Sequence, residues 1–192
     1  MIQAEAGVVI DAARRNGVVH MLCVSVDLES APALVELAAK FDCISASVGV
    51  HPNSRDGEEP DVERLCALAA DPDVIAIGET GLDYFRSQGD LTWQQERFRR
   101  HIRAARAINK PLIIHSRDAR QDVIRILTEE RAAEVGGIMH CFVDDWDTAR
   151  QAMDLNFLIS FSGIVTFKNA VELQETAKQV PLDRMLVESD AP

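Results

Sequence analysis

The stretch from Val74 to Asp83 reads Val-Ile-Ala-Ile-Gly-Glu-Thr-Gly-Leu-Asp, and it decides the fold. Four apolar residues run without interruption into Gly78 and then into a carboxylate, Glu79. A short apolar run bounded by turn residues is typical of a strand buried on both faces, as in a parallel sheet. A carboxylate at the end of such a strand is costly to bury unless it is paired or holds a metal, so Glu79 requires donors or cations nearby.

Outward from this stretch, helical and strand patterns alternate without a linker or a low-complexity segment. Helices are predicted at residues 5–16, 29–40, 60–70, 91–109, 118–131, 144–155 and 169–179. Strands are predicted at residues 18–26, 44–50, from 74 onward, 111–115, 136–142, 157–165 and 185–190. Strict alternation of this kind indicates parallel strands joined by right-handed crossovers.

The predicted fold class is α/β, a TIM-type (β/α) barrel with seven of its eight strands visible, in a single domain over residues 1–192. The pattern starts on a helix and ends on a strand, so a closed barrel needs one more strand in front and one more helix behind. We therefore expect a truncated barrel, incomplete at both ends. An open doubly wound sheet is the alternative, but no strand is followed by a glycine-rich fingerprint.

Composition and charge exclude several classes of protein. The net charge of −11 argues against a broad basic surface for nucleic acid, although a bound metal can reverse the field locally. Aromatic residues make up 5% of the chain, too few for extended base-stacking platforms. No membrane span and no signal peptide is visible, and the four cysteines form no Cys-x-x-Cys pair, which together indicate a cytoplasmic protein with reduced thiols.

Polar residues follow the predicted strands at the end where a parallel barrel carries its active site. They are His51, Glu79, His115, His140 and Asp190. The last four are separated by 36, 25 and 50 positions, which correspond to one or two strand–helix units, so they should lie at one height around a ring. Converging imidazoles and carboxylates suit Zn²⁺, Mn²⁺ or a related divalent ion, and two such ions could lie about 3.5–4 Å apart.

Each candidate also has a structural alternative. A single histidine at a strand end is more often a hydrogen-bonded structural residue, but four acid or imidazole groups at matching heights favour a joint site. His51 precedes a proline and either shapes a turn or contacts substrate. Arg117 either holds a phosphate oxygen or forms a surface salt bridge, and Asp83 caps or braces its loop. His101, beside three arginines in the longest helix, is predicted to lie on a solvated face.

Five segments together resemble the TatD family of metal-dependent hydrolases, part of the amidohydrolase superfamily. They are Val-Gly-Val-His-Pro (48–52), Gly-Glu-Thr-Gly-Leu-Asp (78–83), Pro-Leu-Ile-Ile-His-Ser-Arg (111–117), Met-His-Cys-Phe (139–142) and Glu-Ser-Asp-Ala-Pro (188–192). The similarity covers almost the whole chain, in order and with compatible spacing. It implies a TIM-type barrel and a TatD-type deoxyribonuclease with 3′-to-5′ exonuclease action on DNA, at single strands or 3′ ends.

The resemblance also implies roles for individual residues. Glu79 would bridge two metals and take part in catalysis, and His115 and His140 would bind one of those metals. Asp190 would sit by the other metal and help to activate water. The residues implied to lie near the substrate phosphate are His51 and Arg117. The implied cofactors are Mg²⁺, Mn²⁺ or Zn²⁺, up to two ions in the full-length family.

The chain departs from the family at both ends. The family opens with a strand that ends in His-x-His and supplies two ligands of one metal, and nothing similar is present here. The metal site that relies on that motif should be weak or empty, so one ion or none is expected in this chain. Two unpaired sheet edges would remain, and we expect them to pair between chains, to take up a swapped segment or to aggregate.

Three functional hypotheses follow. The leading one is metal-dependent hydrolysis of phosphodiester bonds, with metal-activated water as the nucleophile. The second is hydrolysis of small esters or amides, since a ring of histidines and carboxylates indicates the chemistry better than it indicates the substrate. The third is a catalytically impaired fragment that binds at most one metal.

Overall fold

The computed structural model describes the backbone of residues 2–189 and the side chains of residues 6–189. Seven strands form one sheet, with bounds β1 Met21–Cys23, β2 Ile44–Val48, β3 Val74–Asp83, β4 Leu112–Arg117, β5 Gly137–Met139, β6 Phe157–Phe161 and β7 Met185–Val187. The α-helices are α1 Ile2–Arg15, α2 Ala31–Lys40, α3 Val62–Leu68, α4 Thr92–Ile108, α5 Arg120–Glu129, α6 Trp146–Asp154 and α7 Val171–Gln179.

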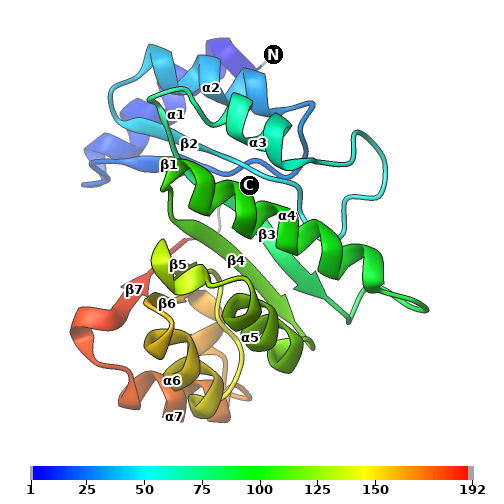
Figure 1. Ribbon diagram of the computed structural model, residues 1–192. Coiled ribbons are helices and arrows are strands. Elements are labelled where there is room, and N and C mark those ends of the chain that lie inside the picture. Colours follow the sequence, from blue (N-terminus) through cyan, green and yellow to red (C-terminus); the bar gives the residue numbers. More distant parts are fainter. Residues whose placement is uncertain (1, 190–192) are drawn as a thin grey trace.

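All neighbouring strands are parallel, and the sheet order from β1 to β7 is the order of the chain. Each crossover carries a helix, and the sheet curls into a half-barrel with β4 near its middle (Figure 1). This confirms the predicted α/β class with seven parallel strands. Within the described residues, β1 and β7 each pair along one side only.

The third strand runs further than its apolar pattern suggests. The pattern predicts Glu79 at the end of the strand, but β3 continues through it to Asp83. The register between β3 and β4 shifts between Ile77 and Thr80, and Gly78 there has a φ of 149°, which favours glycine. The irregular backbone allows the strand to pass Glu79 and still pair with β4 beyond it.

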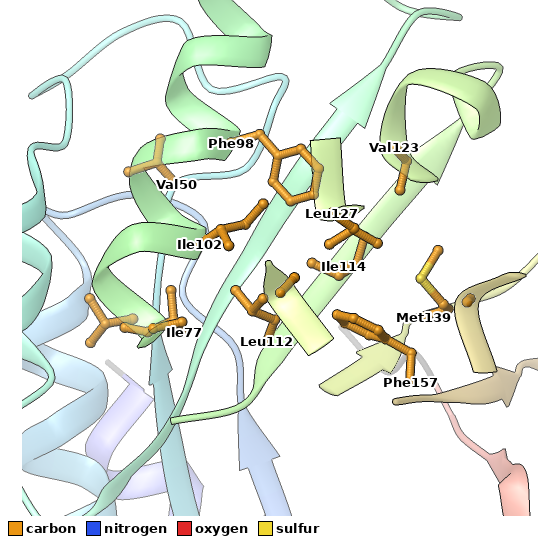
Figure 2. Close-up of a cluster of buried hydrophobic side chains, with 14 of the residues drawn as sticks. Val50, Ile77, Phe98, Ile102, Leu112, Ile114, Val123, Leu127, Met139 and Phe157 are labelled. Carbon is orange, nitrogen blue, oxygen red and sulfur yellow. The ribbon is translucent and has the colours of Figure 1, made fainter. Parts of the chain in front are cut away.

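Helix α4 is held against the middle of the sheet by apolar side chains. Phe98 and Ile102 point from α4 toward Leu112 and Ile114 of β4 and toward Leu127 of α5 (Figure 2). All five side chains are fully buried, and burial of each stabilises the fold by about 1.5–3 kcal/mol. This packing fixes the helix beside the two strands that carry Glu79 and His115.

His101 does not lie on a solvated face, so that prediction was wrong. Its side chain is completely buried in α4, between Phe98 and Ile102 in the sequence. Nδ1 donates to the carbonyl oxygen of Arg97 (2.8 Å), and Nε2 accepts from the backbone N–H of Val50 (3.0 Å). These two bonds require a neutral imidazole, and they connect α4 to the backbone just before His51.

Within the described residues, no helix is both long and apolar enough to cross a membrane. The four cysteines all fall in the described part of the chain, and no disulfide joins any of them.

Candidate metal centre

Three of the predicted site residues meet near the carboxyl ends of β2, β3 and β4. Nδ1 of His115 lies 3.1 Å from Oε1 of Glu79, and Nε2 of His51 lies 3.4 Å from Nδ1 of His115. The three potential ligand atoms all lie within 4.8 Å of one another. The side chains are mostly buried but still reach solvent, so a small ion or a substrate has access to them.

A glycine in β3 permits this close approach. Gly81 pairs with His115 across the two strands and has a φ of 137°. A Cβ atom at position 81 would lie 2.0 Å from the carbonyl oxygen of His115, which is a severe clash. Any side chain at this position would push β3 away from β4 and separate Glu79 from His115.

The proton on His115 is positioned by Asp83. Nε2 of His115 lies 3.2 Å from Oδ2 of Asp83, whose side chain is 1% exposed. Burial raises the pKa of Asp83, but the backbone N–H of Arg86, the amide of Asn53 and His115 more than offset this and hold the pKa below its usual range. The ionised carboxylate only accepts, so Nε2–H of His115 donates to it, and in the neutral ring Nδ1 then keeps its lone pair.

This arrangement places two acceptors face to face. The lone pair on Nδ1 of His115 and a carboxylate oxygen of Glu79 are only 3.1 Å apart. Such a contact is repulsive unless a second proton or a cation lies between the two atoms. Imidazole nitrogen and carboxylate oxygen are ligands for zinc and related divalent ions, so the donor set fits a metal. A carboxylate behind the ligating histidine is the usual outer shell of such a site.

Glu79 is ionised in this environment. Burial raises the pKa of its carboxyl group, but the imidazoles of His115, His51 and His140 outweigh burial and hold the pKa below its usual range. A buried anion among histidines attracts a positive charge.

His51 presents a hydrogen-bond donor to the cluster. The backbone N–H of Asn53 donates to Nδ1 of His51 (3.0 Å), so in the neutral ring the proton lies on Nε2. Burial lowers the pKa of His51 to about 4, with Glu79 opposing and His115 reinforcing the shift, so the ring is neutral at physiological pH. Nε2–H therefore points at the cluster as a donor, which suits contact with a substrate oxygen better than ligation of a metal.

His140 follows β5 and, unlike His51, Glu79 and His115, is not in the group of described residues whose ligand atoms lie within 4.8 Å of one another. It has its own carboxylate partner. Nδ1 of His140 lies 3.0 Å from Glu188, which also accepts from Ser160 and from the backbone N–H of Cys141. The proton of the neutral ring is thus on Nδ1 and the lone pair is on Nε2, the opposite assignment to His115. Asp190, predicted as a ligand and catalytic residue, lies outside the described residues.

Arg117 ends β4, two residues beyond His115. Its guanidinium stacks on the ring of Phe85 at 4.1 Å from the centroid. In the described part of the chain, no carboxylate lies within 4.0 Å of it, so the predicted alternative of a surface salt bridge is not formed. The cation remains available for an anionic ligand beside the cluster.

The sequence did not assign the two outer carboxylates to the site. Asp83 was interpreted only as a brace for its loop, and Glu188 belongs to a family-like motif in which it was given no role. Asp83 lies on β3, the strand that carries Glu79, and Glu188 comes directly after the end of β7. Because residues i and i+4 of a strand share a face, Glu79 and Asp83 could have been paired by their spacing.

Comparisons with known proteins identify the family of the chain. The family described as TatD related DNase matches residues 2–192. The "uncharacterized metal-dependent hydrolase YcfH" of Escherichia coli K12 is 46% identical over 184 residues, which cover 96% of this chain and 69% of that protein. The "3′-5′ ssDNA/RNA exonuclease TatD" of Citrobacter koseri is 30% identical over 186 residues, covering 96% of this chain and 72% of that one.

A solved structure has the same fold. The crystal structure of YJJV, a TatD homologue from Escherichia coli K12, superposes with a TM-score of 0.89 at 24% identity. The match covers 98% of this chain and 74% of the other.

Proposed function

Because this chain belongs to the family of TatD-related DNases, we propose that it is a divalent-metal-dependent hydrolase that cleaves phosphodiester bonds of DNA from the 3′ end. One observation carries the proposal: two facing acceptors, on Glu79 and His115, lie beside a guanidinium without a carboxylate partner among the described residues. The first feature attracts a cation and the second attracts an anion, which are the two requirements of a phosphodiester site.

The residues that would hold the ion are Glu79 through its carboxylate, His115 through Nδ1 and His140 through Nε2. When bound, a divalent ion supplies a Lewis acid for the scissile phosphate and a source of acidified water at neutral pH. Mg²⁺, Mn²⁺ and Zn²⁺ are the candidates, and two histidine nitrogens in the set favour the later members of this series.

Two further residues would orient the substrate. Arg117, stacked on Phe85, would donate to the non-bridging oxygens of the phosphate. His51 would donate from Nε2 to a phosphate oxygen while Asn53 holds its other nitrogen. Asp190 is proposed as the group that accepts a proton from the attacking water, and an Asp190→Asn variant with kcat reduced at unchanged metal content tests that role.

The test is nuclease activity after loading with each metal. The protein is stripped with EDTA, reloaded with Mg²⁺, Mn²⁺ or Zn²⁺, and given single-stranded DNA labelled at either end. We expect mononucleotides to be released from the 3′ end, and activity to fall at least about 10²-fold in Glu79→Gln and His115→Asn variants. His20→Gln is the matched control, because that histidine bonds Ser45 away from the cluster.

Other outcomes would select between the alternatives. Turnover of small esters, lactones or amides without any release of nucleotides would favour the small-molecule amidohydrolase. Bound metal without turnover of any substrate would favour the impaired fragment. Metal content unchanged in both cluster variants would contradict the assigned ligands.

Two further proposals concern the state of the protein in the cell. The absence of disulfides among the four cysteines supports a reducing compartment such as the cytoplasm. The edge strands β1 and β7 pair on one side only within the described residues and carry Leu22 and Val187, 36% and 83% exposed, which supports self-association. A monomeric mass by light scattering at micromolar and higher concentrations would contradict the latter.

A further inference from the structure

A groove of about 370 Å³ opens between the loop after β2 and the first turns of α4. Its lining residues are Arg55, Glu59, Trp93, Glu96, Arg97 and Arg100. None of these residues belongs to the cluster described above. The lining combines one indole ring and three guanidinium groups with two carboxylates, a small excess of positive charge in a chain with a net charge of −11.

Trp93 is held in place by Arg97. The guanidinium of Arg97 lies 4.9 Å from the centroid of the indole, and that of Arg55 lies 5.6 Å from it. Arg97 is itself fixed, because its side chain is only 7% exposed and bonds the carboxylate of Glu59 and the carbonyl oxygens of His51 and Ser54. The indole therefore rests on a rigid support and is partly exposed.

The groove retains positive charge for a ligand. Both carboxylates of the lining already pair with arginines: Glu59 with Arg97, and Glu96 with Arg99 at 3.7 Å. Across the described residues, Arg55 has no carboxylate within 4.0 Å, and Arg100 shares Glu59 only at 3.8 Å. Two guanidinium groups are thus available to an anion at the rim of the groove.

The residues of the groove are joined to the segments that carry the cluster by two hydrogen bonds. Nη1 of Arg97 donates to the carbonyl oxygen of His51 at 3.2 Å. Gln94, the neighbour of Trp93, accepts from the backbone N–H of Asp83 at 3.0 Å. These two bonds fix the wall of the groove to the backbone segments that carry His51 and Asp83.

We infer that this groove binds the nucleotides of a single-stranded nucleic acid next to the scissile phosphate, with a base stacked on Trp93 and backbone phosphates on Arg55 and Arg100. The inference rests on the proposed phosphodiesterase activity and adds the path of its substrate. Stacking on one aromatic ring contributes about 1–3 kcal/mol per base and tolerates any base, because every base has a π-face. The site thus selects single strands without selecting sequence.

Binding is tested first without catalysis. The Trp146→Phe variant leaves Trp93 as the only tryptophan of the chain. Titration of this variant with an eight-nucleotide oligothymidylate in EDTA should quench its fluorescence to saturation. In the Arg55→Ala/Arg100→Ala double variant, the slope of log K against log salt should fall by about 0.7 for each phosphate that no longer binds a guanidinium. Fluorescence that does not respond to the oligonucleotide would overturn the inference, whether or not the protein is a nuclease.

Catalysis gives a second, separate readout. In Trp93→Ala, KM for single-stranded DNA should rise at least about 5-fold with little change in kcat, whereas Trp146→Phe should behave as the wild type. Trp93→Phe should recover most of the loss, because phenylalanine also stacks. An equal loss on methyl 4-nitrophenyl phosphate, which is too small to reach the groove, would indicate damage to the cluster and overturn the inference. Wild-type protein inactive on both substrates would refute the proposed function while the fluorescence titration still decides the groove.

Discussion

The two histidines proposed as metal ligands are held by carboxylates in opposite ways. Nε2 of His115 bonds the carboxylate of Asp83 inside the sheet, where β3 and β4 each have a neighbouring strand on both sides. Nδ1 of His140 bonds the carboxylate of Glu188. Glu188 follows β7, a strand paired on one side only in the described part of the chain. Asp83 is 1% exposed and the Glu188 side chain 16%. The comparison indicates that the β3–β4 half of the site is rigid and the β5–β7 half is adaptable.

Substitution of Asp83 by asparagine should have the largest effect, because it lowers both metal affinity and stability. Three donors converge on this carboxylate, and the new amide would point its own NH₂ at one of them. We expect metal affinity to fall about 100-fold, as when an outer-shell partner is removed, and the free energy of unfolding to fall by about 1–3 kcal/mol. Calorimetric titration with Mn²⁺ and urea unfolding measure the two effects.

The control for that variant is Asp90→Asn, which changes a carboxylate just before α4 that bonds only Thr92 among the described residues. If Asp83→Asn bound metal as tightly as Asp90→Asn, Asp83 would not position His115, and the β3–β4 half of the site could not be called rigid on this ground.

The next largest effect is expected from acidification, which should lower the free energy of unfolding. Burial lowers the pKa of His101 to about 4, with the carbonyl of Arg97 opposing and the charges of Arg97 and Arg100 reinforcing the shift. The unfolded chain binds this proton near pH 6.5, so the stabilisation is complete above pH 6.5 and is lost as pH falls toward 4. The loss is about 3 kcal/mol for one such histidine, and His51 should titrate in the same direction.

The measurement is urea unfolding in EDTA between pH 7 and pH 4. A His101→Gln variant keeps an acceptor for the N–H of Val50 but cannot titrate, so its stability should depend on pH about half as steeply. Identical pH profiles for the variant and the wild type would show that protonation of His101 does not limit stability.

Substitution of Glu188 by glutamine should have a smaller effect than the change at Asp83. Its carboxylate also has three donors, but it lies beside an edge strand that can readjust. We expect a loss of metal affinity of about 10-fold, the lower end of the range for outer-shell residues. The same Mn²⁺ titration measures it, and a loss greater than that of Asp83→Asn would reverse the comparison.

The smallest effect is expected for Ser160→Ala. This change removes one of the donors to Glu188 and leaves His140 and the N–H of Cys141 in place. The free energy of unfolding should fall by less than about 1 kcal/mol, with metal affinity nearly unchanged. A loss of metal affinity as large as that of Glu188→Gln would mean that Ser160, rather than His140, positions the carboxylate of Glu188.

The sequence predicted the architecture well because strand and helix patterns alternate with clear periodicity. It predicted a ring of Glu79, His115, His140 and Asp190 because residues at the carboxyl ends of parallel strands converge. Glu79 and His115 do meet, but their third neighbour within 4.8 Å is His51 rather than His140. It did not show which nitrogen of each histidine carries the proton, because that depends on contacts such as those with Asn53 and Asp83 that form only in the folded chain.

His101 shows how a local pattern misled the prediction. Neighbouring arginines suggested a solvated face, but His101 falls in the stripe of Phe98, Ile102 and Ala105, which has the spacing of a buried helix face. Following positions three, four and seven residues apart, rather than adjacent ones, would have placed it inside.

The order of the strands also has a kinetic consequence. Every strand pairs with its immediate successor, from Met21 with Ile44 to Ile159 with Met185, and the longest step joins Ile77 to Leu112. Each pairing therefore closes a loop of only one crossover, and the entropy of closure stays similar from step to step. Glu79 and His115 come together as soon as a single crossover closes, so the acceptor pair can form early in folding, before the strands that bring His140 and Glu188 have been added.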